Sequence, residues 1–189
     1  MKNMKKSICT PSQTVGPFYS NFLKFNFKNP KSIDENKKIK NSAVLICNIR
    51  DKNENIIKDS FIEYWQIDDI YKKYNLLNFN RVKYDKEHKS IIVKFYQYQF
   101  STYLNIVVFA KGLLNHLHTV VFLEDEKNFQ NEALFKNLPK KRRNSLIASL
   151  IDIKNSVKYY EFNLYLSGNK ETIFFKNLPS KYYAKQKKL

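Results

Sequence analysis

The sequence predicts an all-β fold, an antiparallel β-sandwich with one short helix and long surface loops. Short apolar runs rich in β-branched and aromatic residues recur along the chain, and turn-forming residues bound each of them. Only one stretch has the apolar spacing of a helix. With 189 residues, 43% of them hydrophobic, the chain is long enough to form one domain with a substantial core.

The first two predicted strands form a hairpin. SAVLICNIRD (42–51) is a short, β-branched apolar run of the kind that forms a buried strand. KNEN (52–55) has the composition of a turn, and IIKDSFIEYWQI (56–67) follows as the second strand. Residues 22–41, which precede the hairpin, are rich in Lys and Asn and are expected to form a long surface connection.

The second half of the chain supplies the other predicted strands. YLNIVVFA (103–110) and HTVVFLE (118–124) read as strands, with Gly112 near the turn between them. Apolar and polar residues alternate along 159–168, and TIFF (172–175) follows a Gly-Asn turn as the last strand. The alternation places four side chains on one face: Tyr160, Phe162, Leu164 and Leu166.

The one predicted helix spans Pro139 to Ile151. Proline suits the first helical turn, because its missing N–H would have no partner there. Helical spacing also gathers Leu146, Ile147, Leu150 and Ile151 into one apolar stripe.

The formal net charge of +17 leaves two interpretations open. A basic chain can bind nucleic acid or another polyanion through its phosphates. Alternatively, an AT-rich coding sequence produces abundant Lys, Asn and Ile with little Gly, as observed here. The positive residues are scattered, with small clusters at 1–6, 140–143 and 181–188, so we favour compositional drift.

The sequence also indicates the compartment. Cys9 and Cys47 lie far apart, so they form neither a disulfide framework nor a zinc motif, and a reducing environment is expected. The apolar runs are far shorter than the roughly 20 residues of a spanning helix. A secretory signal has an apolar run after its basic start, and this N-terminus has none. A cytoplasmic location is therefore expected.

The residues that could carry chemistry are few. His116 and His118 would project from the same face of a strand and could bind a metal, but no spacing identifies a third ligand. A structural role is expected instead, with their ring nitrogens bonded to neighbouring backbone. Glu63 and Asp59 are expected to make structural hydrogen bonds or ion pairs. Taken alone, these residues indicate a β-sandwich without a self-contained active site.

Five segments in order resemble the intradiol ring-cleaving dioxygenases, and within them the alpha-type chains of the protocatechuate-cleaving enzymes. They are TPSQTVGPFYS, KDSFIEYWQID, NIVVFAKGLLNHLHTVVFLEDE, KKRRNSLIAS and ETIFF. The resemblance runs from Thr10 to Phe175. We therefore expect one sandwich domain at 10–175, with basic tails at 1–9 and 176–189.

The resemblance implies an activity that two chains share. The family enzyme cleaves 3,4-dihydroxybenzoate between its hydroxyls with O2 and non-haem Fe(III), giving 3-carboxy-cis,cis-muconate. An alpha chain pairs with a beta chain in a large hetero-oligomer, and only the beta chain holds iron, through two Tyr and two His. Where iron-bearing chains carry two histidines, this chain has Tyr103-Leu104-Asn105. The resemblance thus implies no catalytic or metal-binding residue here, and a chain inactive by itself.

The resemblance also implies substrate-binding residues. The N-terminal loop of an alpha chain lines the partner's active site, and the matching residues are Thr14, Gly16, Pro17 and Phe18. Glycine allows close backbone approach and proline stiffens the turn, while threonine offers a hydroxyl and phenylalanine an aromatic wall. Lys111 stands where the family has a basic residue near the substrate carboxylate.

Departures from the family pattern keep alternatives open. The segment from His88 to Thr102 is shorter than in the family, and Cys47-Asn48 stands where glycine is usual. One alternative is a degenerate, non-catalytic scaffold of the same family. Others are a basic polyanion-binding sandwich, and a self-sufficient enzyme with iron at His116 and His118.

Overall fold

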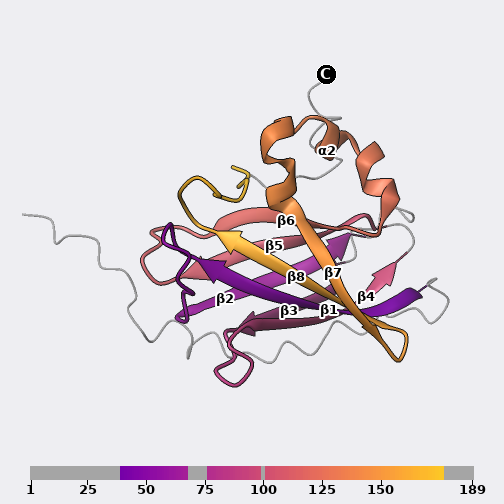
Figure 1. Ribbon diagram of the computed structural model, residues 1–189, viewed down its shortest axis with the longest axis horizontal. Coiled ribbons are helices and arrows are strands. Elements are labelled where there is room, and N and C mark those ends of the chain that lie inside the picture. Colours follow the sequence, from indigo (N-terminus) through magenta and orange to yellow (C-terminus); the bar gives the residue numbers. More distant parts are fainter. Residues whose placement is uncertain (1–38, 68–75, 99–100, 177–189) are drawn as a thin grey trace, which may run out of the picture.

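The computed structural model describes residues 39–67, 76–98 and 101–176, which form a two-layered β-sandwich (Figure 1). Most of these residues lie in extended strands, and the short helical turns gather at one end of the molecule. The strands are β1 (Ile39–Arg50), β2 (Ser60–Ile67), β3 (Leu76–Lys83), β4 (Ile91–Tyr98), β5 (Tyr103–Ala110), β6 (Leu117–Leu123), β7 (Ile147–Lys154) and β8 (Val157–Tyr165). The predicted all-β sandwich is confirmed.

The two layers are joined along one side. One layer has the strand order β4-β1-β8-β7 and the other β3-β2-β5-β6, and β6 pairs with β7 through a two-residue parallel ladder. Most neighbours are antiparallel, but β1 and β8 run parallel over nine residue pairs, from Ser42↔Val157 to Arg50↔Tyr165. The eight strands therefore follow one continuous order, and the sandwich is of mixed rather than purely antiparallel pairing.

The predicted hairpin of 42–51 with 56–67 is wrong. β1 pairs with β4 and β8, whereas β2 pairs with β3 and β5 in the other layer. Only a short contact remains, where the Ile57 N–H donates to the Ile49 carbonyl at 2.8 Å. The chain then crosses between layers, because each strand's apolar face packs against the opposite sheet.

The predicted helix at 139–151 is also wrong over its second half. A 3₁₀ helix covers Lys140–Leu146, and β7 begins at Ile147, which pairs with Phe122 of β6. Two shorter elements precede it, the 3₁₀ helix η1 (Lys127–Asn131) and the single-turn α2 (Ala133–Lys136). In the described part of the chain, no helix is long and apolar enough to cross a bilayer.

The other strand predictions have mixed outcomes. Strands at 103–110, 118–124 and 159–168 are confirmed as β5, β6 and most of β8. The predicted strand at 172–175 is wrong, since only an isolated bridge joins Phe175 to His118 there. β3, β4 and β7 were not predicted as strands.

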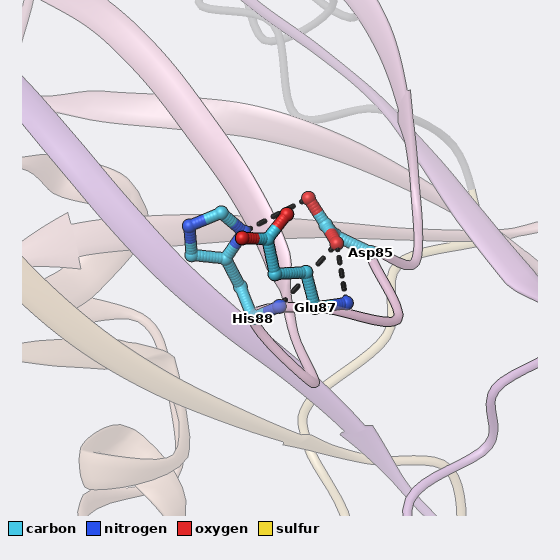
Figure 2. A group of neighbouring side chains, drawn as sticks. All are labelled: Asp85, Glu87 and His88. Carbon is cyan, nitrogen blue, oxygen red and sulfur yellow. Dashed lines mark hydrogen bonds and ion pairs between the residues drawn. The ribbon is translucent and has the colours of Figure 1, made fainter.

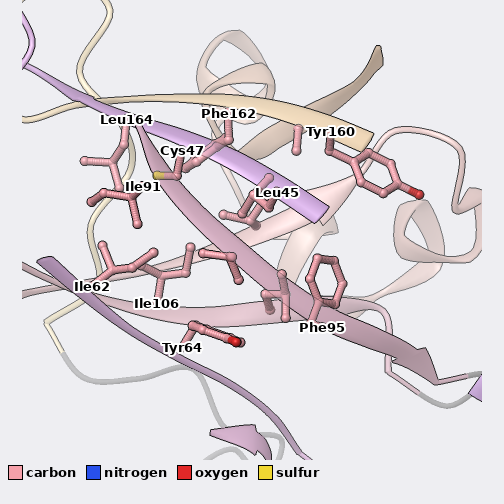
Figure 3. Close-up of a cluster of buried hydrophobic side chains, with 14 of the residues drawn as sticks. Leu45, Cys47, Ile62, Tyr64, Ile91, Phe95, Ile106, Tyr160, Phe162 and Leu164 are labelled. Carbon is pink, nitrogen blue, oxygen red and sulfur yellow. The ribbon is translucent and has the colours of Figure 1, made fainter. Parts of the chain in front are cut away.

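The main core lies between the two layers, and Figure 3 shows side chains from both pointing toward one another. Leu45 and Cys47 of β1 and Phe162 of β8 meet Ile62 of β2 and Ile106 of β5. Burial raises the pKa of the Cys47 thiol to about 12, so this cysteine packs as an apolar, unreactive group. Tyr160, Phe162 and Leu164 share the inner face, as their alternation predicts.

A second core covers the outer face of β6. Val120 and Phe122 of this strand pack against Phe129, Phe135 and other apolar residues of the helical segment 127–146. The ring centroids of Phe122 lie 5.2 Å from those of both Phe129 and Phe135. The helical segment therefore fixes the C-terminal half of β6.

Candidate functional site

The predicted site residues fall into two groups. Thr14, Gly16, Pro17 and Phe18 lie outside the described residues. Lys111 lies within them, in the turn that joins β5 to β6. The site is therefore built from this turn and from the strand positions around it.

Lys111 presents its ammonium group to solvent. Its backbone N–H donates to the Asp59 carbonyl at 2.9 Å, which fixes the backbone where β5 ends. Its Nζ lies 3.7 Å from the Asp59 carboxylate, but these side chains are 73% and 70% exposed. An ion pair this exposed contributes little, so the ammonium can leave Asp59 for another anion at small cost.

Gly112 gives the turn its direction. It has φ +92°, a left-handed conformation that other residues rarely adopt, and no atom lies within 4 Å of the place where a Cβ would stand. Glycine is required here by backbone conformation alone. The same turn exposes Leu114, which is 85% accessible.

Tyr103 and Asn105, where the family's iron-bearing chains carry histidines, lie at the start of β5. The Tyr103 ring packs edge-on against Phe122, with centroids 5.6 Å apart. Asn105 is 1% exposed, and its Nδ2 donates a long 3.5 Å hydrogen bond to the Trp65 carbonyl. The Asn105 Oδ1 is buried and has no hydrogen-bond partner among the described residues.

These two side chains do not fit a ferric site. Imidazole is a preferred ligand of iron, and neither residue supplies one. The packing of Tyr103 against the second core further commits its ring to a structural contact. The residues of the described ranges therefore offer no iron site at this strand.

His116 and His118 lie close together. Their ring centroids are 4.7 Å apart and nearly perpendicular, and the His116 ring also lies 5.5 Å from that of Phe109. The two histidines are not part of any metal-ligating group of three in the described ranges. The structural role expected for the two histidines is thus one of ring packing. The expected hydrogen bond from ring to backbone is not found at Nδ1 of His118, which has no partner among the described residues.

His118 is held in its neutral form. Burial, followed by the neighbouring His116, lowers the pKa of His118 below its ordinary value. The backbone carbonyl of His118 accepts a 2.8 Å hydrogen bond from the Phe175 N–H, so the residue is fixed from the other side of the strand. A neutral imidazole with an unpartnered nitrogen is a feature that a sequence cannot reveal.

A row of stacked side chains crosses the outer face of β3, β2 and β5. The Arg81 guanidinium lies 5.6 Å from the Phe61 ring centroid, and Phe61 stacks on Phe109 at 4.5 Å. Arg81 Nε also donates to the Glu63 carboxylate at 2.9 Å, which confirms the ion pair expected for Glu63. Asp59 is paired as expected too, although with the exposed Lys111. The row continues through Phe109 to His116 and links these strands to the β5–β6 turn.

A third cluster, Asp85, Glu87 and His88, occupies the turn between β3 and β4 (Figure 2). The Asp85 carboxylate accepts hydrogen bonds from the backbone N–H of Glu87 at 2.8 Å and of His88 at 3.3 Å. Its other oxygen lies 2.9 Å from the His88 ring nitrogen. These bonds account for the cluster as a side-chain-stabilised turn, and we assign it no metal.

No family model matches the chain. The protocatechuate 3,4-dioxygenase alpha chain of Pseudomonas putida is 28% identical over 192 residues, covering 88% of this chain and 95% of that protein. The alpha chain of the same name from Burkholderia cepacia is 25% identical over 195 residues, covering 88% and 96%.

Solved structures share the fold. The dioxygenase domain of a dioxygenase–carbohydrate-binding protein fusion from Streptomyces sp. SirexAA-E has a TM-score of 0.51 at 13% identity, covering 68% of this chain and 80% of that one. Catechol 1,2-dioxygenase from Acinetobacter sp. ADP1 has a TM-score of 0.51 at 10% identity, covering 78% and 59%. At these identities the likeness establishes the sandwich fold.

Proposed function

We propose that this chain, a homologue of protocatechuate 3,4-dioxygenase alpha chains with the fold of the intradiol dioxygenases, is the non-iron subunit of such an enzyme. It would act in the cytoplasm with an iron-bearing beta subunit, in a large hetero-oligomer. The complex would cleave 3,4-dihydroxybenzoate with O2 to 3-carboxy-cis,cis-muconate. Fe(III) would be held by the partner, and this chain would be inactive alone.

One observation carries the proposal. The strand positions at which iron-bearing relatives place imidazoles hold Tyr103 and Asn105, and both are committed to packing. Similarity to alpha chains over 88% of the sequence supports a role beside a second chain rather than independent catalysis. The exposed His116 and the half-buried His118 do not replace the missing donors, because no third ligand accompanies them in the described ranges.

The residues of this chain would complete the partner's pocket. Thr14, Gly16, Pro17 and Phe18 would line it, and proline at position 17 would reduce the conformational entropy lost when the pocket closes. Lys111 would add positive potential toward the substrate carboxylate, since its ammonium is only weakly held by Asp59. Lysine keeps the charge of an arginine there but lacks its two-pronged hydrogen bonding.

The test uses the reconstituted two-subunit enzyme. Gly16→Val and Pro17→Ala should each lower turnover without changing the iron content of the complex. Lys111→Gln should raise KM for the aromatic acid more than kcat falls, whereas Lys127→Gln, an exposed lysine of the helical segment, should change neither. Unchanged kinetics in all three site variants would overturn the assigned roles.

A further inference from the structure

Four lysines lie among the eight residues that line a recess at one end of the β3–β2 layer. It has a volume of about 690 Å³, which is within the usual range of 300–1,000 Å³ for sites that bind small molecules. Three chain segments contribute to it: the loop before β2, the end of β3, and the turn that leads to β4. We call it the lysine recess, and its lining residues are Ile56, Lys58, Asp59, Ser60, Lys83, Tyr84, Lys86 and Lys89.

The positive charge of the lysine recess is not neutralised by the other residues that the structure describes. Four lysines line it against one carboxylate, that of Asp59. Asp59 is oriented toward Lys111, outside the recess. No carboxylate in the described ranges forms an ion pair with any of the four lysines, although four lysines elsewhere in those ranges have one.

The other acidic groups nearby lie in the turn between β3 and β4, and of these the Asp85 carboxylate is occupied. Asp85 accepts hydrogen bonds from two backbone N–H groups and from the His88 ring. Glu87 lies against Asp85 and His88 in the same turn (Figure 2). The turn therefore directs its carboxylates toward one another and leaves Lys86 and Lys89 without a partner of opposite charge in the described part.

The backbone that carries these lysines is held in place. The Tyr84 N–H donates to the Ser60 carbonyl at 3.1 Å, which ties the end of β3 to the start of β2. Asp85 and Ser90 exchange backbone hydrogen bonds of 2.8 and 3.3 Å, which close the turn containing Lys86 and Lys89. An anion entering the recess would thus need to order lysine side chains but not the backbone.

We propose that the lysine recess binds a small anion that carries two or more phosphate groups. Like charges gathered in one hollow repel one another, and a multivalent anion removes that repulsion while it forms several charge-assisted hydrogen bonds. The recess contains no arginine, and its lysine ammonium groups can bind phosphate oxygens as compact point charges. This site is separate from the function proposed above and does not depend on it.

The test titrates the full chain with inorganic tripolyphosphate by isothermal titration calorimetry in a low-salt buffer. Lys83→Gln/Lys86→Gln/Lys89→Gln should weaken binding at least about tenfold, because it removes three charge-assisted hydrogen-bond donors from the recess. The matched control, Lys127→Gln/Lys136→Gln/Lys140→Gln, removes the same charge from exposed lysines outside the recess, and should bind within about twofold of wild type. Arginine at positions 83, 86 and 89 should retain most of the binding.

Two results would overturn the proposal. One is the absence of heat from tripolyphosphate binding to the wild type, and the other is equal weakening in the recess and control triples, which would indicate diffuse charge. A single-stranded oligonucleotide tests whether a macromolecular polyanion binds at the same place. Displacement of the bound oligonucleotide by tripolyphosphate supports the recess as the binding site, and failure of displacement contradicts it. If circular dichroism shows that the triple is unfolded, Lys86→Gln/Lys89→Gln, confined to the turn, is judged by the same criteria.

Discussion

The Tyr160 hydroxyl donates a 2.8 Å hydrogen bond to the Asp125 carboxylate, which ties β8 of one layer to the turn after β6 of the other. The same hydroxyl accepts a 2.9 Å hydrogen bond from the Gln97 side chain on β4, and the Lys158 ammonium pairs with Asp125. Burial, followed by the Asp125 carboxylate, raises the pKa of Tyr160. Its surroundings therefore favour the protonated phenol, which donates to Asp125.

Tyr160→Phe should lower the free energy of unfolding by about 1–3 kcal/mol, the usual effect of leaving a buried polar group without its partner. Gln97 is 3% exposed and would lose the acceptor for its side-chain N–H. Urea denaturation measures the change. Tyr159→Phe, on the other face of β8 and only half-buried, is the control and should stay within about 0.5 kcal/mol of wild type. Equal effects of the two changes would show that the hydroxyl network does not stabilise the sandwich.

Acid should weaken the wild type more than an Asp125→Asn variant. Burial acts to raise the pKa of Asp125, but hydrogen bonds from Lys158 and Tyr160 outweigh it and hold that pKa below its ordinary value. A carboxylate whose folded pKa is lowered stabilises the fold above the unfolded pKa of about 3.9 and loses that contribution as pH falls through the folded value. Urea midpoints from neutral to acid pH should therefore converge for the two proteins. Parallel curves would contradict the assignment.

The two glycines with positive φ offer a matched comparison. Gly112→Ala should cost about 1–2 kcal/mol from left-handed strain alone, because open space surrounds the added methyl. Gly168 has φ +94°, and a Cβ there would lie 3.2 Å from the Lys52 Cβ, so Gly168→Ala should cost more. Thermal or urea unfolding of both variants measures the difference, and a Gly112→Ala cost equal to or above that of Gly168→Ala would exclude the close contact.

His118 should titrate below the ordinary histidine pKa in an NMR pH series. His116→Ala should raise the pKa of His118 toward that value without reaching it, because burial is the larger cause and remains. A lowered folded pKa in a base means that stability is present above the unfolded pKa and is lost as pH falls below it. A His118 pKa above the ordinary value would indicate an unrecognised anionic partner.

The elements that could be predicted are those whose pattern matches their local environment. In β8, Tyr160, Phe162 and Leu164 alternate because one face of the strand packs on the core. The apolar run of β5 was equally clear, since its residues are buried on both faces from Leu104 to Val108. Alternation and a continuous apolar run can both be recognised as strands from the sequence alone, without knowledge of the pairing partner.

The elements that were missed depend on contacts distant in sequence. The stripe around Leu146, Ile147 and Leu150 fits a helix, but pairing of Ile147 with Phe122 and of Leu150 with Tyr160 makes it a strand. The chain likewise crosses from one layer to the other after Ile57, because β1 and β2 pack their apolar faces against each other's sheets across the main core. The lysine recess and the Tyr160 network join segments that nothing in the linear pattern connects.

The proposed function requires that this chain supply no iron site. Metal analysis and a visible absorption spectrum of the isolated chain, purified from iron-replete cells, test it directly. We expect a colourless protein without stoichiometric iron, which becomes part of an active, coloured enzyme only when the iron-bearing partner is added. One tightly bound iron per isolated chain, with the absorption of tyrosinate bound to Fe(III), would contradict it.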